Sequence, residues 1–479
     1  MVLVLALLAA AGATYRFDLG ERVLGIEPAN PVDNPAKVAP PEGLDLPEPV
    51  AAPAVATPLS ASSTALAPAA VRRAIEPLLK NPDLGKHVVA LVQPLGSGTT
   101  VFRAGHGLAT PASTLKLLTT TAALEALGPA TTFTTTVVEG ATPGSIVLVG
   151  GGDPFLEPAP VKRAEAAETY PTRADIVTLA NDTAAALRAK GRTRVRLGYD
   201  DTLFSGPAVD PHWESTYIPE EVVSPIGALW VDRGVDASGE HRVADPAKAA
   251  AEAFARALKR AGITVLTDPT HTRAPRDTAG QLAAVESAPL SEIVQEVLTT
   301  SDNEAAEVLA RHVGLAVSGT GSFAAGVAGI KQTLAGLGVP LAGARLYDGS
   351  GLARDDRLDP ATLLGVLRVA SARMHPELRA VIDGLPVAAF SGSLTDRFVD
   401  GDPAGRGRVR AKTGTLTGVH ALAGVVQDLD GDLMLVALVA DQVPTANPAA
   451  ADDARAALDR AAAALAGCHC AAVAATDAE

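Results

Sequence analysis

Ser113 and Lys116 are the residues of this sequence whose types and spacing most directly suggest chemistry. A serine hydroxyl is a weak nucleophile until a neighbouring base takes its proton, and a lysine becomes such a base when burial lowers its pKa. On a helix, side chains three residues apart project from the same face. Leu115, Leu117 and Leu118 surround the lysine, so we expect it to be buried and to activate the serine.

The residues around this pair predict a helix that begins just before Ser113. Thr110 would cap the helix, Pro111 would occupy its first turn, and Gly128 with Pro129 would end it. The positive potential at such an N-terminus would stabilise a developing oxyanion. The alternative is an ordinary capped helix whose lysine is solvated.

Ser301, Asp302 and Asn303 form a second polar group, for which two interpretations stand. With Glu304 they match a capping box, in which the serine would open a helix over residues 303–313. The preceding residues are also helical in pattern, which places the group in a tight loop between two helices. There Ser301 would relay a proton and Asn303 would bind a substrate amide. Both interpretations can hold at once.

A third group, Lys412, Thr413, Gly414 and Thr415, lies within a predicted strand. Gly414 would leave room for a peptide to lie against the strand edge, and a lysine beside a threonine suits a terminal carboxylate. The alternative is an exposed edge strand with a protective lysine.

In chain order the three groups have the form S-x-x-K, S-D-N and K-T-G, which resembles penicillin-binding proteins and serine β-lactamases. Further segments make the resemblance more specific. Over about residues 66–445 the chain is similar to the D-alanyl-D-alanine carboxypeptidase/endopeptidase family of class C low-molecular-mass penicillin-binding proteins. The additional similar segments are residues 149–154, 203–207, 225–229 with 231–232, 348–352 and 392–394.

The resemblance implies a role for each motif residue. Ser113 would be acylated with Lys116 as its base, and Ser301 would pass the proton to the leaving D-alanine. Asn303 would bind the peptide amide. Lys412, together with Thr413, would hold the terminal carboxylate.

The resemblance also implies an oxyanion hole made by the backbone N–H groups of Ser113 and Thr415. Asp153 and Arg354 match positions that the family uses to bind the diamino acid of the stem peptide. A turn-forming aspartate and a solvated surface arginine are the alternatives for these two residues. Peptidoglycan stem peptides would be substrates and β-lactams inhibitors, and no cofactor or metal ion is expected.

The composition disfavours several other classes of protein. The chain has 479 residues, of which 47% are hydrophobic, and a net charge of −14, so we expect an acidic globular protein that does not bind nucleic acid. Cys468 and Cys470 are too close in sequence to staple a domain, and they lack the second ligand cluster of a zinc site. We interpret them as part of an inert tail in preference to a functional thiol pair.

The N-terminal residues predict export. The apolar residues 1–13 resemble the hydrophobic part of a signal peptide without a preceding Lys or Arg, so we interpret residues 1–26 as a signal or anchor remnant. Residues 27–65 are rich in Pro and Ala and would form a linker. We expect the protein in the cell envelope, and peripheral association with the membrane or the wall stays open.

The expected fold class is α/β. Residues 66–133 and 290–445 would form a split catalytic domain of the penicillin-binding/β-lactamase-like transpeptidase type, an antiparallel sheet covered by helices. Residues 134–289 would be inserted domain material, which we expect to tune substrate choice and to leave the acylation chemistry intact. Residues 446–479 would form a C-terminal helix and tail.

These expectations indicate an exported serine peptidase that cleaves the D-alanyl-D-alanine bond, with endopeptidase cleavage of cross-links left open. The first alternative is a β-lactamase or esterase-like serine hydrolase. The long insertion between Ser113 and Ser301 and the absence of a convincing E-x-x-L-N deacylation motif argue against it. The second alternative is a catalytically silent wall-binding protein, against which the intact motifs count.

Overall fold

The computed structural model describes residues 65–162, 169–236, 238–275, 280–399, 403–445 and 449–472. The expected signal or anchor remnant therefore lies outside the described residues, as does all of the expected linker except its last residue.

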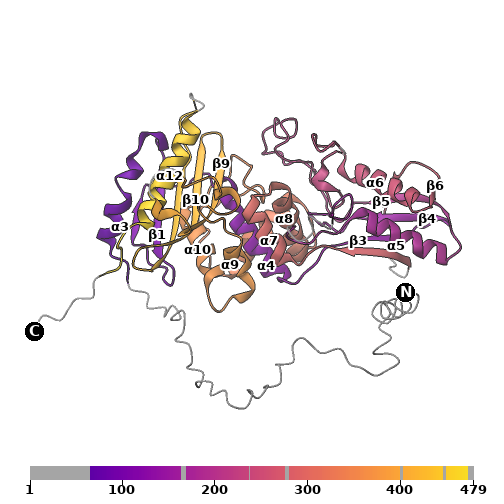
Figure 1. Ribbon diagram of the computed structural model, residues 1–479, viewed down its shortest axis with the longest axis horizontal. Helices are drawn as coiled ribbons and strands as arrows, with labels where there is room; N and C mark the ends of the chain where they lie inside the picture. The colour runs from indigo at the N-terminus through magenta and orange to yellow at the C-terminus, as the bar shows by residue number, and fades with distance from the viewer. Residues whose placement is uncertain are drawn as a thin grey trace, which may run out of the picture. The chain divides into compact units, whose positions relative to one another are not determined.

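Five described strands form an antiparallel sheet from the two ends of the chain (Figure 1). In spatial order they are β2 (Phe102–Ala104), β1 (Val88–Pro94), β11 (Leu433–Ala440), β10 (Val419–Gln427) and β9 (Val409–Leu416). The inner strands β10 and β11 are buried on both faces, which explains their nearly continuous apolar sequence. The expected antiparallel sheet is confirmed, and β9, which carries the K-T-G group, is one of its edges.

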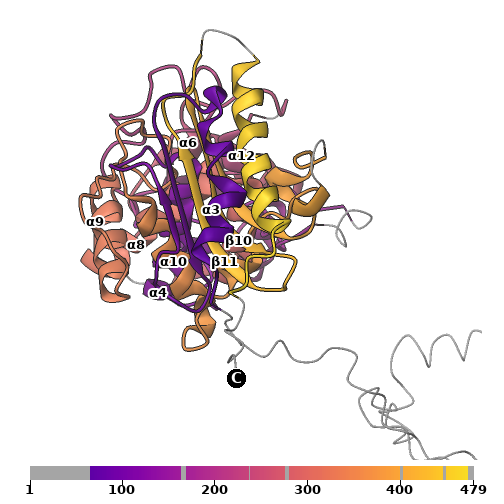
Figure 2. The same ribbon diagram turned by 90° about the vertical axis from the view of Figure 1, so that its left-hand side faces the viewer.

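Helices cover both faces of this sheet. On one face, α3 (Pro68–Ile75) and α12 (Ala450–Ala466) lie side by side and share an apolar core with the strands (Figure 2). On the other face, a larger core joins the strands to a helical layer. Its helices are α4 (Lys116–Leu127), α7 (Leu290–Thr300), α8 (Asn303–Ser318), α9 (Phe323–Gly336), α10 (Pro360–Ser371) and α11 (Ala380–Asp383).

Helix α4 is enclosed on all sides, because its sequence is apolar or small around the whole circumference. Every residue from Lys116 to Leu124 is buried. The first residue of this helix is a lysine, and its charged group must therefore find hydrogen-bond partners inside the protein.

A second, mixed sheet lies within the part of the sequence expected to be an insertion. Its strands follow the order β6 (Thr264–Val265), β5 (Arg194–Asp200), β4 (Ser145–Val149), β3 (Thr134–Glu139) and β8 (Gln281–Glu286), and β7 (Thr270–His271) also pairs with β5. Helices α5 (Ile176–Ala189) and α6 (Pro246–Arg260) pack on it through a separate apolar core.

Contacts group residues Ser63–Glu479 into one compact unit. The two sheets belong to that unit, so the division into catalytic and inserted domains stays a prediction. Among the described residues no single helix has the length and apolarity to cross a membrane; α8 and α9 meet these criteria only as a pair bent by 71°.

The C-terminal region contains the expected helix, α12, followed by the two cysteines. Cys468 and Cys470 form a disulfide with each other. The interpretation of this segment as an inert tail therefore needs correction. Its two cysteines are joined by a disulfide, and the buried Cys470 packs in the same apolar core as α12.

Candidate active site

Ser113 lies on a short 3₁₀ turn, Ala112–Leu115, that leads into α4. The expected cap by Thr110 is wrong: no side chain caps this turn, and the Thr110 hydroxyl instead accepts a hydrogen bond from Arg357 Nη1 at 2.7 Å. Ala112 has a left-handed φ of 46°, a conformation that a residue with a Cβ adopts only when its surroundings hold it there. Packing around the turn therefore presents Ser113 at the start of a buried helix.

Lys116 is fully buried and has three hydrogen-bond acceptors. Its Nζ donates to Ser113 Oγ at 2.9 Å, to Asn303 Oδ1 at 2.8 Å and to the Ser350 carbonyl oxygen at 2.8 Å. Burial lowers the pKa of Lys116 to about 8, although nearby buried carboxyl groups act in the opposite direction. The expectation of a buried lysine beside the serine is confirmed, and the solvated lysine is excluded.

The Asn303 amide oxygen and the Ser350 carbonyl oxygen fix the direction of the Lys116 lone pair. An amide oxygen and a peptide carbonyl oxygen can only accept hydrogen bonds. When Lys116 is neutral, its two N–H bonds therefore point to Asn303 and Ser350, and its lone pair faces the Ser113 hydroxyl. This arrangement can remove the hydroxyl proton.

The loop between α7 and α8 carries the second polar group. Ser301 ends α7 with a left-handed φ of 64°, and the expected tight loop between two helices is confirmed. The capping-box interpretation is wrong, because Asp302 is the residue whose side chain caps α8, at 2.8 Å from a backbone N–H. The Ser301 hydroxyl instead accepts from Lys412 Nζ at 2.8 Å. The loop thus sets Ser301 against Lys412 and Asn303 against Lys116.

Lys412 is fully buried behind the outer edge of β9. Besides Ser301, its Nζ donates to the carbonyl oxygen of Thr413 at 2.9 Å. Burial, followed by the charge of Lys116, holds the pKa of Lys412 well below its usual range. A lysine that protects an edge strand would be exposed to solvent, so that alternative is wrong for this residue.

A cavity of about 340 Å³ opens beside β9. Thr413 and Thr415 line it together with Ser393, Arg397 and Arg455. The hydroxyl groups of Ser393 and Thr413 lie 2.8 Å apart. These hydroxyl donors suit a carboxylate ligand, whereas Arg397 is already paired with Asp459 and the carboxylate of Asp396 also lines the cavity.

The space beside Gly414 is occupied by the turn that carries Ser113. A Cβ at this position would come within 2.7 Å of the Pro111 carbonyl oxygen and 3.2 Å of the Ala112 Cβ. The expectation that Gly414 leaves room for a peptide is therefore wrong: the missing side chain lets β9 pack against this turn.

Asp153 does not face an open subsite. It is 4% exposed, and its Oδ1 accepts from the Phe155 N–H at 2.8 Å, which is the geometry of a turn-forming aspartate. Burial raises its pKa to about 7. A carboxyl group enclosed in this way cannot pair with a substrate amine without rearrangement, so the structure favours the turn-forming alternative.

Arg354 lies just beyond the end of β9 and is partly exposed. Its Nη2 donates to the Thr417 carbonyl oxygen at 2.7 Å, and its Nε pairs with Glu214 at 3.3 Å. The side chain is therefore tied to two neighbours, unlike the freely solvated surface arginine that was the alternative.

Some residues that the sequence did not single out hold the site together. Glu307 is fully buried and accepts from the Gly349 N–H at 3.0 Å and from the Ser350 N–H at 2.7 Å. It thereby fixes the carbonyl group that Lys116 uses. The similar segments 348–352 and 392–394 were the available signal for Ser350 and Ser393, but no role was attached to them.

Comparison with known proteins agrees with this geometry. The family model for the D-Ala-D-Ala carboxypeptidase 3 (S13) family matches residues 71–241 and 236–465. The chain belongs to this family. A carboxypeptidase DacB of Mycolicibacterium smegmatis is 35% identical over 435 residues, which cover 88% of this chain and 90% of that protein. A D-alanyl-D-alanine carboxypeptidase of Actinomadura sp. (strain R39) is 30% identical over 452 residues, which cover 76% of this chain and 79% of that protein.

Membership makes the protein a serine DD-peptidase by class, and it disfavours the β-lactamase-like and catalytically silent alternatives. Among solved structures, penicillin-binding protein 4 of Haemophilus influenzae is similar with a TM-score of 0.65 at 19% identity, covering 83% of this chain and 97% of that chain. A β-lactam complex of the same protein has a TM-score of 0.58 at 20% identity. At this identity the likeness concerns the fold alone, and it confirms the expected fold class.

Proposed function

We propose that this protein hydrolyses the D-alanyl-D-alanine bond of peptidoglycan stem peptides through an acyl-serine at Ser113. The observation that supports this most is the 2.9 Å hydrogen bond between Ser113 and the buried Lys116. Because the other two N–H directions of the lysine are occupied by oxygen acceptors, the serine meets a base whose lone pair is already aligned.

In the acylation half of the reaction, Ser113 Oγ bonds to the carbonyl carbon of the penultimate D-alanine as Lys116 accepts the hydroxyl proton. The backbone N–H groups of Ser113 and Thr415 would stabilise the oxyanion. The C–N bond then breaks, and the leaving amine of the terminal D-alanine takes up a proton that Ser301 relays.

In the deacylation half, a water molecule adds to the ester carbonyl and gives a proton to Lys116. The ester C–O bond breaks, the proton returns to Ser113 Oγ, and the shortened peptide leaves as a carboxylic acid. The same residues serve as acid and base in both halves, as microscopic reversibility requires.

Substrate would lie along the edge strand β9. Asn303 would bind a peptide amide, and Thr413, supported from behind by Lys412, would hold the terminal carboxylate in the cavity beside the strand. An anionic carboxylate raises the pKa of a nearby lysine, so bound substrate would favour the charged form of Lys412. Arg354, at the end of β9, would contact the remainder of the stem peptide.

β-Lactams would acylate the same serine, because their strained amide takes the place of the scissile bond. We also propose that the protein works outside the cytoplasm, where peptidoglycan is found. The Cys468–Cys470 disulfide supports this location, since such bonds persist in oxidising compartments.

Purified muropeptides with pentapeptide stems provide the test. We expect mass spectrometry to show the loss of the terminal D-alanine with the wild-type protein and no loss with Ser113→Ala. Separation of cross-linked dimers into monomers in the same assay would add endopeptidase activity. A folded wild-type protein that leaves both substrates intact, or a Ser113→Ala variant that still releases D-alanine, would overturn the proposal.

A further inference from the structure

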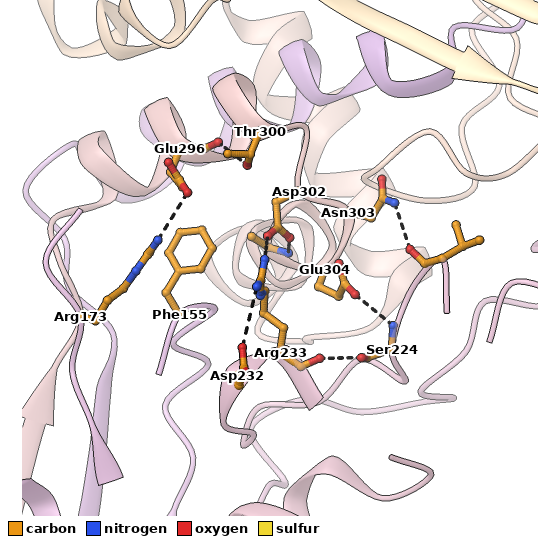
Figure 3. Close-up of polar contacts among 12 residues, drawn as sticks. Phe155, Arg173, Ser224, Asp232, Arg233, Glu296, Thr300, Asp302, Asn303 and Glu304 are labelled. Carbon is orange, nitrogen blue, oxygen red and sulfur yellow. Dashed lines mark hydrogen bonds and ion pairs between the residues drawn. The ribbon is translucent and has the colours of Figure 1, made fainter. Parts of the chain in front are cut away.

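A segment of the insertion, Val222–Arg242, contacts each of the three residues that follow Ser301 (Figure 3). This was not expected, because all three catalytic motifs lie outside residues 134–289 and the insertion was predicted to leave acylation intact. The contacts differ in kind, and each constrains a different part of the loop between α7 and α8.

The amide of Asn303 is oriented by the insertion. Its Nδ2 donates to the Val222 carbonyl oxygen at 3.3 Å, while its Oδ1 accepts from Lys116 Nζ at 2.8 Å. A peptide carbonyl accepts hydrogen bonds and cannot donate them, so Nδ2 must face Val222 and Oδ1 must face the lysine. The insertion thereby selects the amide orientation that the catalytic lysine needs.

Asp302 is held by Arg233. The Nη1 of Arg233 lies 3.1 Å from Asp302 Oδ2. The other carboxylate oxygen of Asp302, Oδ1, caps α8. Arg233 has a left-handed φ of 52°, next to Asp232 with a φ of 46°. Figure 3 shows the Arg233 side chain between Asp302 and Asp232. Non-glycine residues rarely adopt this conformation, so two in a row indicate that contacts with the surrounding residues hold the backbone in place here.

Glu304 is held by Arg242 and by a backbone group. The Nη2 of Arg242 lies 2.8 Å from Glu304 Oε1, and the Ser224 N–H donates to the same oxygen at 3.2 Å. The Ser224 hydroxyl and Arg242 also donate to the Arg233 carbonyl oxygen. The two arginines and the serine therefore form one connected unit against the start of α8.

These ion pairs also bear on the charge around Lys116. Asp302 and Glu304 are almost fully buried, and in their anionic forms they favour the charged form of Lys116. Burial raises the pKa of Glu304 to about 7, so this carboxyl group acts as an anion mainly above that pH. An arginine beside each carboxylate offsets this influence. The charged and titratable groups that face Lys116 are Asp348, Glu307, Asp302, Glu304 and Lys412, with Arg233 and Arg242 behind the carboxylates.

We propose that Arg233 and Arg242 of the insertion are positioning residues for acylation, because they hold the loop that presents Ser301 and Asn303 to the two lysines. They act through Asp302 and Glu304 and touch neither the nucleophile nor its base. The proposal rests on the acyl-transfer function proposed above, and it means that the insertion contributes to the chemical step as well as to substrate choice.

The variants Arg233→Gln and Arg242→Gln test this. We expect the second-order rate of acylation by a penicillin to fall about tenfold or more in each. In Arg233→Gln the rise of this rate with pH should also move to higher pH, because Asp302 loses its positive partner and raises the pKa of Lys116. In Arg242→Gln the profile should move less, because the pKa of Glu304, already about 7, rises further and the carboxyl group takes up a proton. Arg233→Lys keeps the charge and should restore most of the pH profile, and Arg242→Lys should restore most of the rate.

Arg173→Gln is the matched control. Arg173 also joins the insertion to the catalytic helices, through Glu296 of α7 at 3.4 Å, and it lies over the ring of Phe155 within the insertion. In the described structure it contacts none of residues 301–304. It should keep the wild-type rate and pH profile. Thermal unfolding is measured for every variant.

The outcomes separate this proposal from the proposed function. A folded wild-type protein that no penicillin acylates would contradict the proposed function. Wild-type acylation with unchanged rate and pH profile in both glutamine variants would contradict the positioning role. An equal loss in Arg173→Gln would also contradict it, since the loss would then reflect weaker attachment of the insertion in general.

Discussion

Lys116 and Lys412 enter the same buried region, and each faces a different serine. Burial disfavours the charged form of both, and the charge of Lys116 lowers the pKa of Lys412 further. A charge on one amine therefore disfavours a charge on the other. Lys116 itself loses its proton as the pH rises past about 8.

This pKa predicts the pH dependence of acylation. Only neutral Lys116 can accept the Ser113 proton, and its neutral fraction grows as pH rises through the pKa of about 8. The rate of penicillin acylation should therefore rise about tenfold per pH unit below that value and level off above it. Stopped-flow or gel-based labelling from pH 6 to pH 10 measures the profile.

Lys116→Arg provides the comparison for this profile. A guanidinium stays protonated throughout this range, so acylation should fall by about 10²–10⁴-fold above pH 8, where the wild-type lysine is neutral, and should no longer rise with pH. A wild-type profile that is flat through pH 8, or near-wild-type labelling of Lys116→Arg, would be incompatible with a lysine base.

The sequence identified the polar side chains that the structure brings together around Ser113 but not the groups that orient them. Ser113, Lys116, Ser301 and Asn303 stand in motifs whose spacing is local. Ser350 contributes a peptide carbonyl group, which any residue type carries, so the similar segment 348–352 indicated its position but not its role. Glu307 was missed because its partners lie on a loop some forty residues further along the chain.

At the scale of elements, the turn that carries Ser113 is held between two neighbours. The loop 348–352 packs against one side of the turn, and β9 packs against the other. Gly351 has a φ of 83°, and a Cβ there would lie 2.0 Å from the Ala112 carbonyl oxygen. On the β9 side, Gly414 also packs closely against the turn, next to the Pro111 carbonyl oxygen. The left-handed φ of Ala112 is consistent with a turn shaped from both sides.

Gly351→Ala should disturb this turn. The new methyl group would overlap the backbone of Ala112, and alanine disfavours the left-handed conformation, so both stability and acylation should fall. We expect a loss of about 1–3 kcal/mol in the free energy of unfolding and a drop of about tenfold or more in penicillin acylation. Denaturant unfolding and labelling rates measure the two effects.

Gly336→Ala is the control, because a Cβ at the end of α9 meets no atom within 4 Å. It should leave both measurements close to those of the wild type. If Gly351→Ala were equally neutral, the turn would not depend on the close approach of this loop.

The elements themselves followed from local patterns more readily than their contacts did. The sequence predicted the strand that carries Lys412, which is β9, and helical patterns predicted the two helices around Ser301. The 3₁₀ turn at Ser113 was predicted as a capped helix start, because Thr110 and Pro111 form a typical start pattern. The contacts of this turn with the loop 348–352 and with β9 are not visible in the sequence.

For the whole molecule, the insertion and the catalytic motifs are not independent. The sequence places residues 134–289 between two parts of the catalytic region, which suggests an addition that can be varied freely. The contacts of Val222, Arg233 and Arg242 with the loop after Ser301 could not be predicted, because they join segments with no common pattern. Fold class and central chemistry were predictable, whereas this coupling required the structure.

Mapping the acylated residue tests the central claim most directly. The protein is incubated with a penicillin, digested and analysed by mass spectrometry, with heat-unfolded protein and Ser113→Ala as controls. We expect one adduct, on the peptide that contains Ser113, and none in either control. An adduct on a different residue, or wild-type labelling of Ser113→Ala, would contradict the assignment of Ser113 as the nucleophile.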